Sequence, residues 1–206
     1  MEDLKKCPLC GGERVGEVFE QRDLLVSLKF FAVWGCGECG LFFTNPRPAD
    51  HEISQYYQSP EYISHNDKRG GVLSLAYRIV RWAMIRYKIK IIQKALGARF
   101  KPRTLDYGCG TGEFLSVAAK MGWGVSGIEP NAIARNAAQS KGLPVSSNIM
   151  ELDPLVGRQQ FDVITMWHVL EHIHEPQKII STLKGILAEN GIIVVAVPEH
   201  KSYDAH

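Results

Sequence analysis

The sequence predicts an α/β protein in which a parallel sheet follows a small cysteine-rich module. From Thr104 onward, segments with strand and helix patterns alternate, which is typical of β-α-β units with both sheet faces covered. Near the N-terminus, four cysteines form two Cys-x-x-Cys pairs. A glycine-rich turn at residues 108–112 joins the first strand of the alternating region to a helix, as in ligand-binding sheets of this kind.

Composition places the chain among ordinary globular proteins. Of its 206 residues, 45% are apolar and 22% are charged. No stretch reaches the ~18 uninterrupted apolar residues of a membrane span, and the acidic start Met-Glu-Asp does not resemble a signal peptide. We therefore expect a cytoplasmic protein without a transmembrane segment. The odd number of cysteines, five, argues against a disulfide framework.

Residues 1–48 are expected to form a zinc ribbon. Cys7 and Cys10 are separated by 25 residues from Cys36 and Cys39, and each pair lies in a glycine-rich turn. Four thiolates complete a tetrahedral zinc site with no open position, which makes the expected role structural. A ribbon that has lost its metal and a redox pair are the alternatives, although neither pair begins a helix after a strand as a redox motif does.

The remaining N-terminal elements are a hairpin and a connector. Glu17–Glu20 and Leu24–Trp34 are rich in Val, Phe and Leu, as hairpin strands would be. Thr44–Pro48 should end regular structure. Residues 49–102 are predicted to be a helical connector that begins with a short helix at Asp50–Tyr57.

Residues 72–96 are predicted to form one long helix. Apolar residues recur there at steps of three and four: Leu75, Ile79, Trp82, Ile85, Ile89 and Ile92. Residues 70–104 contain nine basic and no acidic side chains. Four interpretations stay open: a solvated helix packed on the core, a surface for anionic substrates, an RNA-binding face, or a helix that lies on a membrane.

The region 103–206 is predicted to be the main α/β domain. Its expected strands are Thr104–Tyr107, Val125–Glu129, Val145–Ser147, Phe161–Met166 and Ile192–Val197. Its expected helices are Glu113–Met121, Ala132–Lys141 and Pro176–Leu187.

The glycine turn and the end of the next strand point to a nucleoside-containing ligand. The spacing Gly-x-Gly-x-Gly at Gly108, Gly110 and Gly112 differs from the Gly-x-Gly-x-x-Gly of dinucleotide binders. Glu129 ends the second strand, where a carboxylate can accept hydrogen bonds from both hydroxyls of a ribose. Cys109 lies inside the turn, and we expect its side chain to pack there rather than act as a nucleophile.

Three segments of this region resemble class I S-adenosylmethionine (SAM)-dependent methyltransferases. They are Leu-Asp-Tyr-Gly-Cys-Gly-Thr-Gly-Glu-Phe-Leu, Gly-Ile-Glu-Pro-Asn and Phe-Asp-Val-Ile-Thr-Met-Trp-His-Val-Leu-Glu-His-Ile. Residues 1–62 resemble the N-terminal ribbon of many bacterial small-molecule members, on the two cysteine turns, Thr-Asn-Pro-Arg-Pro and Gln-Tyr-Tyr-Gln-Ser-Pro-Glu-Tyr. The implied fold is a Rossmann-like parallel sheet preceded by a zinc ribbon and a helical connector.

The resemblance implies a cofactor site for SAM. The residues implied are Asp106, Gly108, Cys109, Gly110 and Gly112 at the amino-acid end, Glu129 at the ribose, Pro130, Asn131, Asn148 and Ile149 around the adenine, and Met166 and Trp167 near the methionyl amine.

A histidine-rich segment follows the fourth strand at the same sheet edge. His168 and His172 are four residues apart with Glu171 beside them, so a helical turn would align them for acid–base catalysis. Hydrogen bonding to loop backbone and a second metal site are the competing interpretations. The segment lacks the Asn/Asp-Pro-Pro-Tyr tetrapeptide of many nucleobase amine methylases, which favours an oxygen or carbon acceptor.

The predicted function is methyl transfer to a small molecule, such as a sugar, a nucleotide-sugar or a quinone-like metabolite. An RNA methyltransferase that uses the ribbon and basic helix is the second hypothesis, and a non-catalytic SAM-binding module is the third. The class I sheet has seven strands, whereas this chain ends nine residues after its fifth expected strand. We therefore expect a fragment of a longer protein with an incomplete sheet of about five strands. The sequence does not indicate an oligomeric state.

Overall fold

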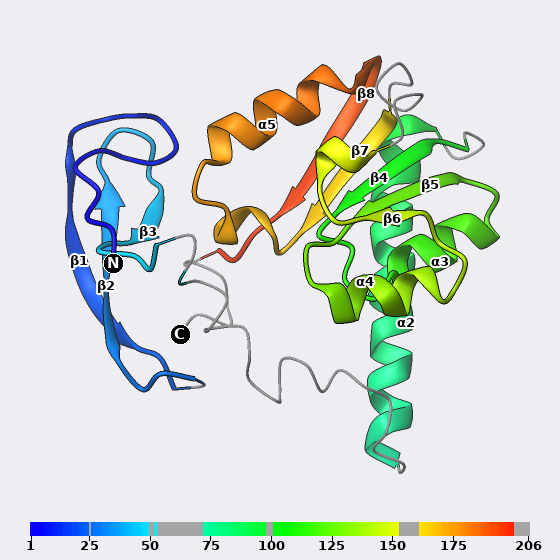
Figure 1. The fold of residues 1–206 in the computed structure, drawn as a ribbon, viewed down its shortest axis with the longest axis horizontal. Helices are drawn as coiled ribbons and strands as arrows, with labels where there is room; N and C mark the ends of the chain where they lie inside the picture. The colour runs from blue at the N-terminus through cyan, green and yellow to red at the C-terminus, as the bar shows by residue number, and fades with distance from the viewer. Residues whose placement is uncertain (25, 50–51, 53–71, 98–100, 153–160, 200–206) are drawn as a thin grey trace. The chain divides into compact units, whose positions relative to one another are not determined.

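A computed structural model describes residues 1–24, 26–49, 52, 72–97, 101–152 and 161–199. The chain clusters into two compact units (Figure 1). The first comprises Met1–Leu75 with His174–Lys178, and the second comprises Ala76–Ile173 with Ile179–His206. The short helix expected at Asp50–Tyr57 lies outside the described residues.

The N-terminal module is a three-stranded antiparallel sheet in the order β1-β2-β3. The strands are β1 (Val15–Arg22), β2 (Phe30–Cys36) and β3 (Phe42–Thr44). The expected hairpin is therefore present, and β3 is an additional short strand. Regular structure ends at Thr44, as the sequence predicts.

The strand expected at Leu24–Trp34 begins only at Phe30, because the preceding residues form a closed loop. The Asp23 carboxylate accepts hydrogen bonds from the backbone N–H groups of Val26 and Ser27, at 3.1 and 2.7 Å. These local bonds satisfy the backbone within the loop and compete with strand pairing.

Asn45 fixes the N-terminal segment to the end of β3. Its side chain is fully buried; Oδ1 accepts from the N–H of Leu4 at 2.7 Å, and Nδ2 donates to the Leu4 carbonyl at 3.1 Å. The Asn45 side chain thus pairs with both the N–H and the carbonyl of Leu4, as the backbone of a neighbouring strand would. The Asn45–Pro46 peptide bond is cis.

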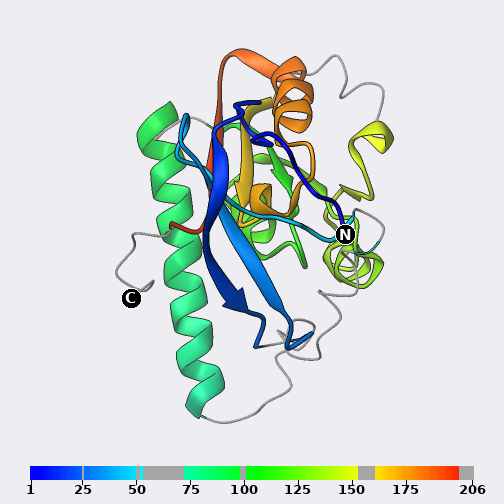
Figure 2. The ribbon, with the colours of Figure 1, turned by 90° about the vertical axis from the view of Figure 1, so that its left-hand side faces the viewer.

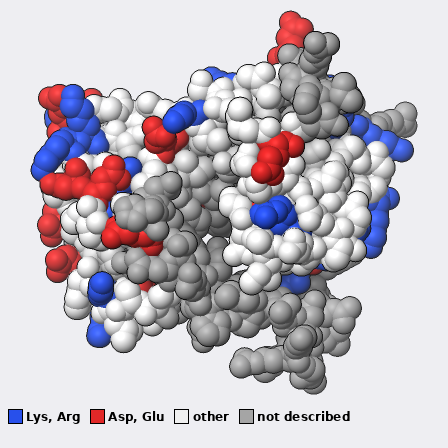
Figure 3. All heavy atoms as spheres, viewed as in Figure 1, with Lys and Arg blue, Asp and Glu red and all other residues white. Residues whose placement is uncertain are grey.

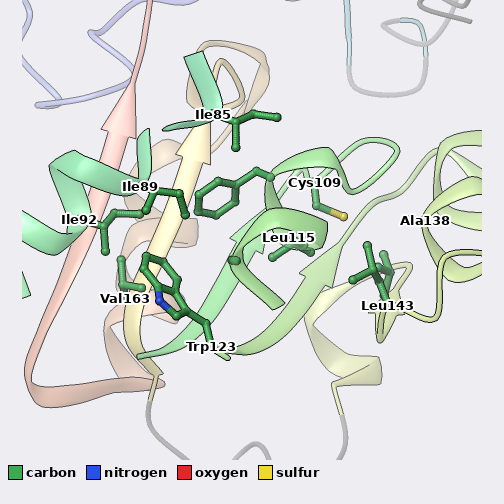
Figure 4. Packing of buried hydrophobic residues seen from close by; sticks show 12 residues of the cluster. Ile85, Ile89, Ile92, Cys109, Leu115, Trp123, Ala138, Leu143 and Val163 are labelled. Atoms are coloured by element: carbon green, nitrogen blue, oxygen red, sulfur yellow. The ribbon is translucent and has the colours of Figure 1, made fainter. Parts of the chain in front are cut away.

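The long helix α2 (Val72–Leu96) has the predicted bounds and is drawn unbroken in both views (Figures 1 and 2). Ile85, Ile89 and Ile92 are buried and point toward the core (Figure 4). Ile79 and Trp82, which the sequence places on the same stripe, are instead 58% and 57% exposed. The stripe therefore serves as a core face only in the C-terminal half of the helix.

The second unit contains a five-stranded, fully parallel sheet in the order β6-β5-β4-β7-β8. Its strands are β4 (Arg103–Tyr107), β5 (Gly124–Ile128), β6 (Val145–Ser146), β7 (Phe161–Trp167) and β8 (Leu187–Ala196). Its helices, beside α2, are α3 (Glu113–Lys120), α4 (Ala132–Gln139) and α5 (Pro176–Gly185). The α/β prediction and its five strands are confirmed.

The last strand starts earlier than the sequence predicts. Helix α5 ends at Gly185 and β8 begins at Leu187, whereas the helix was expected to reach Leu187 and the strand to begin at Ile192. Pairing with β7 includes an irregularity there, and a Cβ on Gly191 would lie 2.9 Å from the Phe161 carbonyl oxygen. In the sequence, Gly191 looks like a turn residue. In the structure, it allows the backbones of β7 and β8 to approach closely.

Helices cover both faces of the sheet. One apolar cluster contains Ile85, Ile89 and Ile92 of α2 with Phe114 and Leu115 of α3. The other cluster lies under α5 and includes its fully buried Leu183. Such two-sided burial is what a parallel sheet requires. Among the described helices, none is long and apolar enough to cross a membrane.

Candidate functional site

The glycine loop lies at the carboxyl edge of the sheet, between β4 and α3. The N–H groups of Gly108 and Cys109 both donate to the carbonyl of Ile128, at 2.8 and 3.0 Å, which folds the loop over the end of β5. Gly108 and Gly112 have φ of 76° and 77°, in the left-handed region that favours glycine. The sequence prediction of a tight ligand-binding turn is consistent with this geometry.

The three glycines of the loop have different neighbours. A Cβ on Gly108 would collide with Val169, and one on Gly112 would collide with Leu143. A Cβ on Gly110 would meet nothing within 4 Å, although its φ of 55° is also left-handed. Gly108 and Gly112 therefore serve packing, while the backbone at Gly110 faces open space that a ligand can enter.

Cys109 is buried inside the loop. Burial, together with the nearby Asp106 and Glu129 carboxylates, raises the pKa of its thiol to about 12. A thiol that stays protonated is a poor nucleophile. Its side chain belongs to the apolar cluster beneath α2 and α3, in line with the packing role expected from the sequence.

Glu129 follows β5 directly and is tied to the loop. Oε2 accepts from the N–H of Gly110 at 2.8 Å, and Oε1 accepts from the N–H of Asn131 at 2.9 Å. Arg135 donates to the carbonyls of Glu129 and Pro130, at 2.7 and 2.8 Å, which fixes the turn. Each carboxylate oxygen has a second lone pair, so the group retains capacity to accept from two hydroxyls.

Asp106 is the charged group buried beneath the loop. It is 2% exposed and accepts a hydrogen bond from the Thr165 hydroxyl at 2.6 Å. Burial raises the pKa of its carboxyl to about 7, against the opposing effects of the Thr165 hydrogen bond and the Lys88 charge. The protein therefore holds a carboxyl that changes charge near neutral pH.

This pKa makes folding stability depend on pH. Between the ordinary value of 3.8 and about 7, the folded chain binds a proton at Asp106 that the unfolded chain has lost. Stability therefore falls as pH rises through this window. In Asp106→Asn the fall should be absent, so between pH 5 and pH 8 the variant should gain about 2–3 kcal/mol relative to the wild type. Denaturant unfolding at both pH values measures the difference, and parallel pH profiles would contradict it.

Lys88 of α2 is a site residue that the sequence analysis did not single out. Its ammonium lies 4.5 Å from the centroid of the Trp167 ring. Burial lowers the pKa of Lys88, while the Asp106 charge raises it. Trp167 also meets Phe114 edge-on at 5.9 Å. A signal was present in the sequence, because Lys88 stands one turn after Ile85 and thus borders the buried stripe.

The residues expected around the adenine mostly have local structural roles. Asn131 caps α4, with Oδ1 accepting from two backbone N–H groups, and is exposed. Pro130 is exposed beside it. The Asn148 side chain caps the short turn that follows β6 and donates to Glu151. Ile149 packs against the apolar cluster under α5.

The two residues that end β7 point to opposite faces of the sheet. The Met166 side chain is fully buried in the cluster under α5, so only its backbone faces the carboxyl edge. Trp167 packs against the cluster beneath α2 and α3. Of this pair, Trp167 is therefore the one whose side chain lies with Lys88.

The histidine segment brings its three predicted residues together. The distance from Glu171 Oε1 is 3.7 Å to His168 Nδ1 and 4.0 Å to His172 Nε2. The arrangement is not the regular helical turn expected from the spacing: Leu170–His172 is a short 3-10 helix, and His168 precedes it with φ of 57°. Burial lowers the pKa of His172, against the Glu171 charge. His172 can therefore accept a proton at neutral pH.

The four N-terminal cysteines form one cluster in the first unit. All four Sγ atoms lie within 4.8 Å of one another, and two of the pairs are 3.6 Å apart. A tetrahedron with Zn–S bonds of ~2.3 Å has sulfur–sulfur edges of ~3.8 Å, so the spacing fits zinc. Backbone N–H groups of Leu9, Gly12 and Glu38 point at sulfurs at 3.4 Å. None of the described cysteines forms a disulfide.

Known proteins resemble the second unit. Residues 78–206 match the family described as a methyltransferase domain. The ubiquinone biosynthesis O-methyltransferase of Actinobacillus pleuropneumoniae serotype 7 (strain AP76) is 33% identical over 116 residues, which are 52% of this chain and 50% of that protein. The enzyme of the same name from Pasteurella multocida (strain Pm70) is 34% identical over 118 residues, 50% of this chain and 48% of that protein. The chain thus spans about half the length of the curated relatives it matches.

Solved structures show the same fold. The plantazolicin methyltransferase BpumL, in complex with a pentazolic desmethylPZN analog and S-adenosylhomocysteine (SAH), aligns with a TM-score of 0.53 and 19% identity over 73% of this chain and 58% of that one. Magnesium protoporphyrin IX methyltransferase (ChlM) from Synechocystis PCC 6803, with bound SAM, aligns with a TM-score of 0.50 and 19% identity over 70% of this chain and 74% of that one. The family match covers more than half of the chain, and the fold agrees with it. The chain therefore belongs to the methyltransferase-domain family and has the fold of a class I SAM-dependent methyltransferase.

Proposed function

We propose that the chain binds SAM at the carboxyl edge of its sheet and transfers a methyl group to an oxygen or carbon atom of a small-molecule acceptor. The observation that carries the proposal is the position of Glu129. Its carboxylate is fixed by Gly110 and Asn131 and keeps capacity for the two hydroxyls of a ribose. The open space at Gly110 lets a ligand approach the loop backbone beside it.

Two opposite charges suit the amino-acid end of the cofactor. Asp106 beneath the loop provides a negative field for an ammonium group once it is ionised, and Lys88 above Trp167 provides a positive charge for a carboxylate. Lys88 is partly desolvated, so its interaction with a carboxylate would be screened less than that of a surface lysine. These residues thereby fit the methionyl part of SAM.

The role of Lys88 can be measured by cofactor binding alone. Lys88→Met keeps the apolar stem over Trp167 and removes the charge, so SAH affinity should fall about tenfold, which corresponds to one charge-assisted contact. Lys90→Met, on the exposed side of the same helix, is the matched control. Calorimetric titration with SAH distinguishes the two. Equal affinities for both variants would remove Lys88 from the site.

Proton removal is assigned to the histidine segment. SAM, when bound, supplies a methyl group activated by its sulfonium. An acceptor hydroxyl must lose its proton as the methyl group arrives, and the imidazole of His168 or His172 can take it. Glu171, within 4.0 Å of both rings, stabilises the imidazolium that forms.

Replacing His168 tests this assignment. His168→Asn suits the left-handed backbone at this position, since asparagine tolerates positive φ, and removes the imidazole. We expect kcat to fall by about 10²–10⁴-fold with SAH affinity unchanged within about twofold. The assay is transfer of a radiolabelled methyl group to a panel of sugars, nucleotide-sugars and quinone-like acceptors. Glu175→Gln, at an exposed carboxylate directly before α5, is the control, and an unchanged kcat in His168→Asn would refute the assignment.

The charge pattern of the ribbon favours a small-molecule acceptor over RNA. Its basic side chains lie beside acidic ones, with ion pairs Lys5–Asp3, Lys6–Glu13 and Arg47–Glu2. Figure 3 shows the two signs intermixed on the visible face of this module. A surface that grips phosphates would present cations without such partners. The names of the curated relatives, which are O-methyltransferases, support oxygen as the acceptor atom.

The cysteine cluster is assigned a structural zinc ion. The described ligand set consists of four cysteines, which completes a tetrahedral shell and leaves no position for substrate. The ion would therefore fold the module rather than act in methyl transfer.

A further inference from the structure

Helix α2 carries a second apolar stripe that the sheet does not use. Its members are Val80, Met84, Tyr87 and Ile91, spaced four, three and four residues apart. At 3.6 residues per turn, this stripe lies roughly 140° around the helix from the buried Ile85–Ile89–Ile92 stripe. Val80, Met84 and Tyr87 are 59%, 52% and 61% exposed, and Ile91 is partly buried.

Basic residues border this second stripe on both sides. Lys90 and Lys94 lie along one edge, and Arg81 lies along the other, whereas Lys88 is directed toward Trp167. Across its 25 residues, α2 contains six basic and no acidic side chains. The Arg86 guanidinium lies 4.7 Å from the centroid of the Trp82 ring, itself 57% exposed. An exposed apolar stripe between cations, with aromatic residues beside it, is the pattern of a helix that lies in a membrane interface.

We infer that the second stripe of α2 is a docking surface for an anionic lipid bilayer. The apolar side chains would enter the boundary between headgroups and acyl chains, while the flanking lysines and arginines reach lipid phosphates. A second copy of the chain fits less well, because pairing two acid-free helices would bring like charges together. Nucleic acid also fits less well, since its phosphates would leave Val80, Met84 and Tyr87 without an apolar partner. The inference does not depend on the proposed methyl transfer.

The test is co-sedimentation with vesicles. The 206-residue chain is mixed with vesicles of phosphatidylcholine alone, or of phosphatidylcholine with 30% phosphatidylglycerol, at rising NaCl concentrations. We expect at least tenfold tighter binding to the anionic vesicles and a loss of this difference at high salt, because screening weakens each cation's contribution.

Matched variants distinguish vesicle binding through the second stripe from nonspecific adsorption of the protein to vesicles. The double variant Met84→Glu with Tyr87→Glu should lower binding at least tenfold, whereas Ile133→Glu, at a residue of α4 that is 68% exposed, should leave it unchanged. Lys90→Ala should weaken binding about fivefold, and Lys120→Ala, on the exposed side of α3, should not. Circular dichroism and thermal melting verify that each variant is folded.

Three results would overturn the inference. Equal binding to neutral and anionic vesicles would exclude recognition of anionic lipid. Unchanged binding by a folded double variant would place the contact elsewhere. A dimer in light scattering that the double variant converts to monomer, without vesicle binding by the wild type, would identify the stripe as a contact between copies of the chain.

Discussion

Replacing Glu129 with alanine is expected to weaken SAH binding by at least a hundredfold. The carboxylate would accept two hydroxyl hydrogen bonds, and bonds to a charged acceptor are worth about 1.5–3 kcal/mol each. The same change removes the acceptor of the Gly110 N–H. The glycine loop then loses the hydrogen bond that fixes the backbone at Gly110, where the ligand would approach. Both effects act on the cofactor site, and neither requires the methyl acceptor.

Calorimetric titration with SAH measures the change directly. Glu189→Ala, an exposed carboxylate on β8 near the opposite edge of the sheet, should bind as the wild type does. Glu129→Gln separates charge from shape: it keeps one amide oxygen as an acceptor but replaces the other with a donor that faces an N–H group. We expect its affinity to lie between those of wild type and Glu129→Ala. A folded Glu129→Ala protein with wild-type affinity would disprove the assigned ribose site.

Removing zinc should unfold the N-terminal module entirely. Structural zinc sites bind with about 10–16 kcal/mol in isolated fingers, and a module of under 50 residues has little core to replace that energy. The three strands present mostly half-buried or exposed side chains, so the module has little apolar core to hold it together once its cysteines lose a shared ion. Protease digestion after treatment with a zinc chelator should therefore cut within residues 1–48 and leave the parallel sheet intact.

The fifth cysteine supplies the control. Cys36→Ser should lower the zinc content from one ion per chain to a small fraction, while Cys109→Ser should keep one ion, because Cys109 lies in the other unit. Zinc is quantified by atomic emission on the purified chain. One retained ion in Cys36→Ser, or protease resistance without zinc, would contradict the structural role.

Elements with strong periodicity were predictable from the sequence, and the loops that border them were less so. Helix α2 has the expected bounds because its apolar residues recur over many turns. The side chains of Leu24 and Val26 predict a strand after Asp23, whereas hydrogen bonds from the Val26 and Ser27 N–H groups to the Asp23 carboxylate hold the backbone in a loop. The start of β8 was missed because Gly191 looks like a turn and instead serves close strand packing.

In the candidate site too, residues close together in sequence were predictable, whereas residues brought together by tertiary packing were not. Glu129 and the glycine loop were predictable because a single β-α-β unit, β4-α3-β5, brings them together at one sheet edge. For Lys88, the sequence indicates only that it borders the buried stripe of α2. Its position beside Asp106 and Trp167, about 20 and 80 residues away in sequence, is created by the tertiary packing of α2. The sequence places Met166 at the end of β7, and the structure adds that strand alternation directs its side chain into the cluster under α5 and leaves its backbone at the carboxyl edge.

The two cysteine turns of the ribbon have nearly the same backbone. In each, a glycine after the second cysteine has a left-handed φ, 74° at Gly11 and 76° at Gly40, and donates its N–H to the carbonyl of the first cysteine at 2.9 Å. The module therefore uses one local backbone arrangement twice, once for each pair of cysteines. Each copy supplies half of a coordination shell and cannot close it alone. The four-thiolate site therefore depends on two turns that are separated by 25 residues between Cys10 and Cys36, so it forms only when the folded sheet brings both turns together.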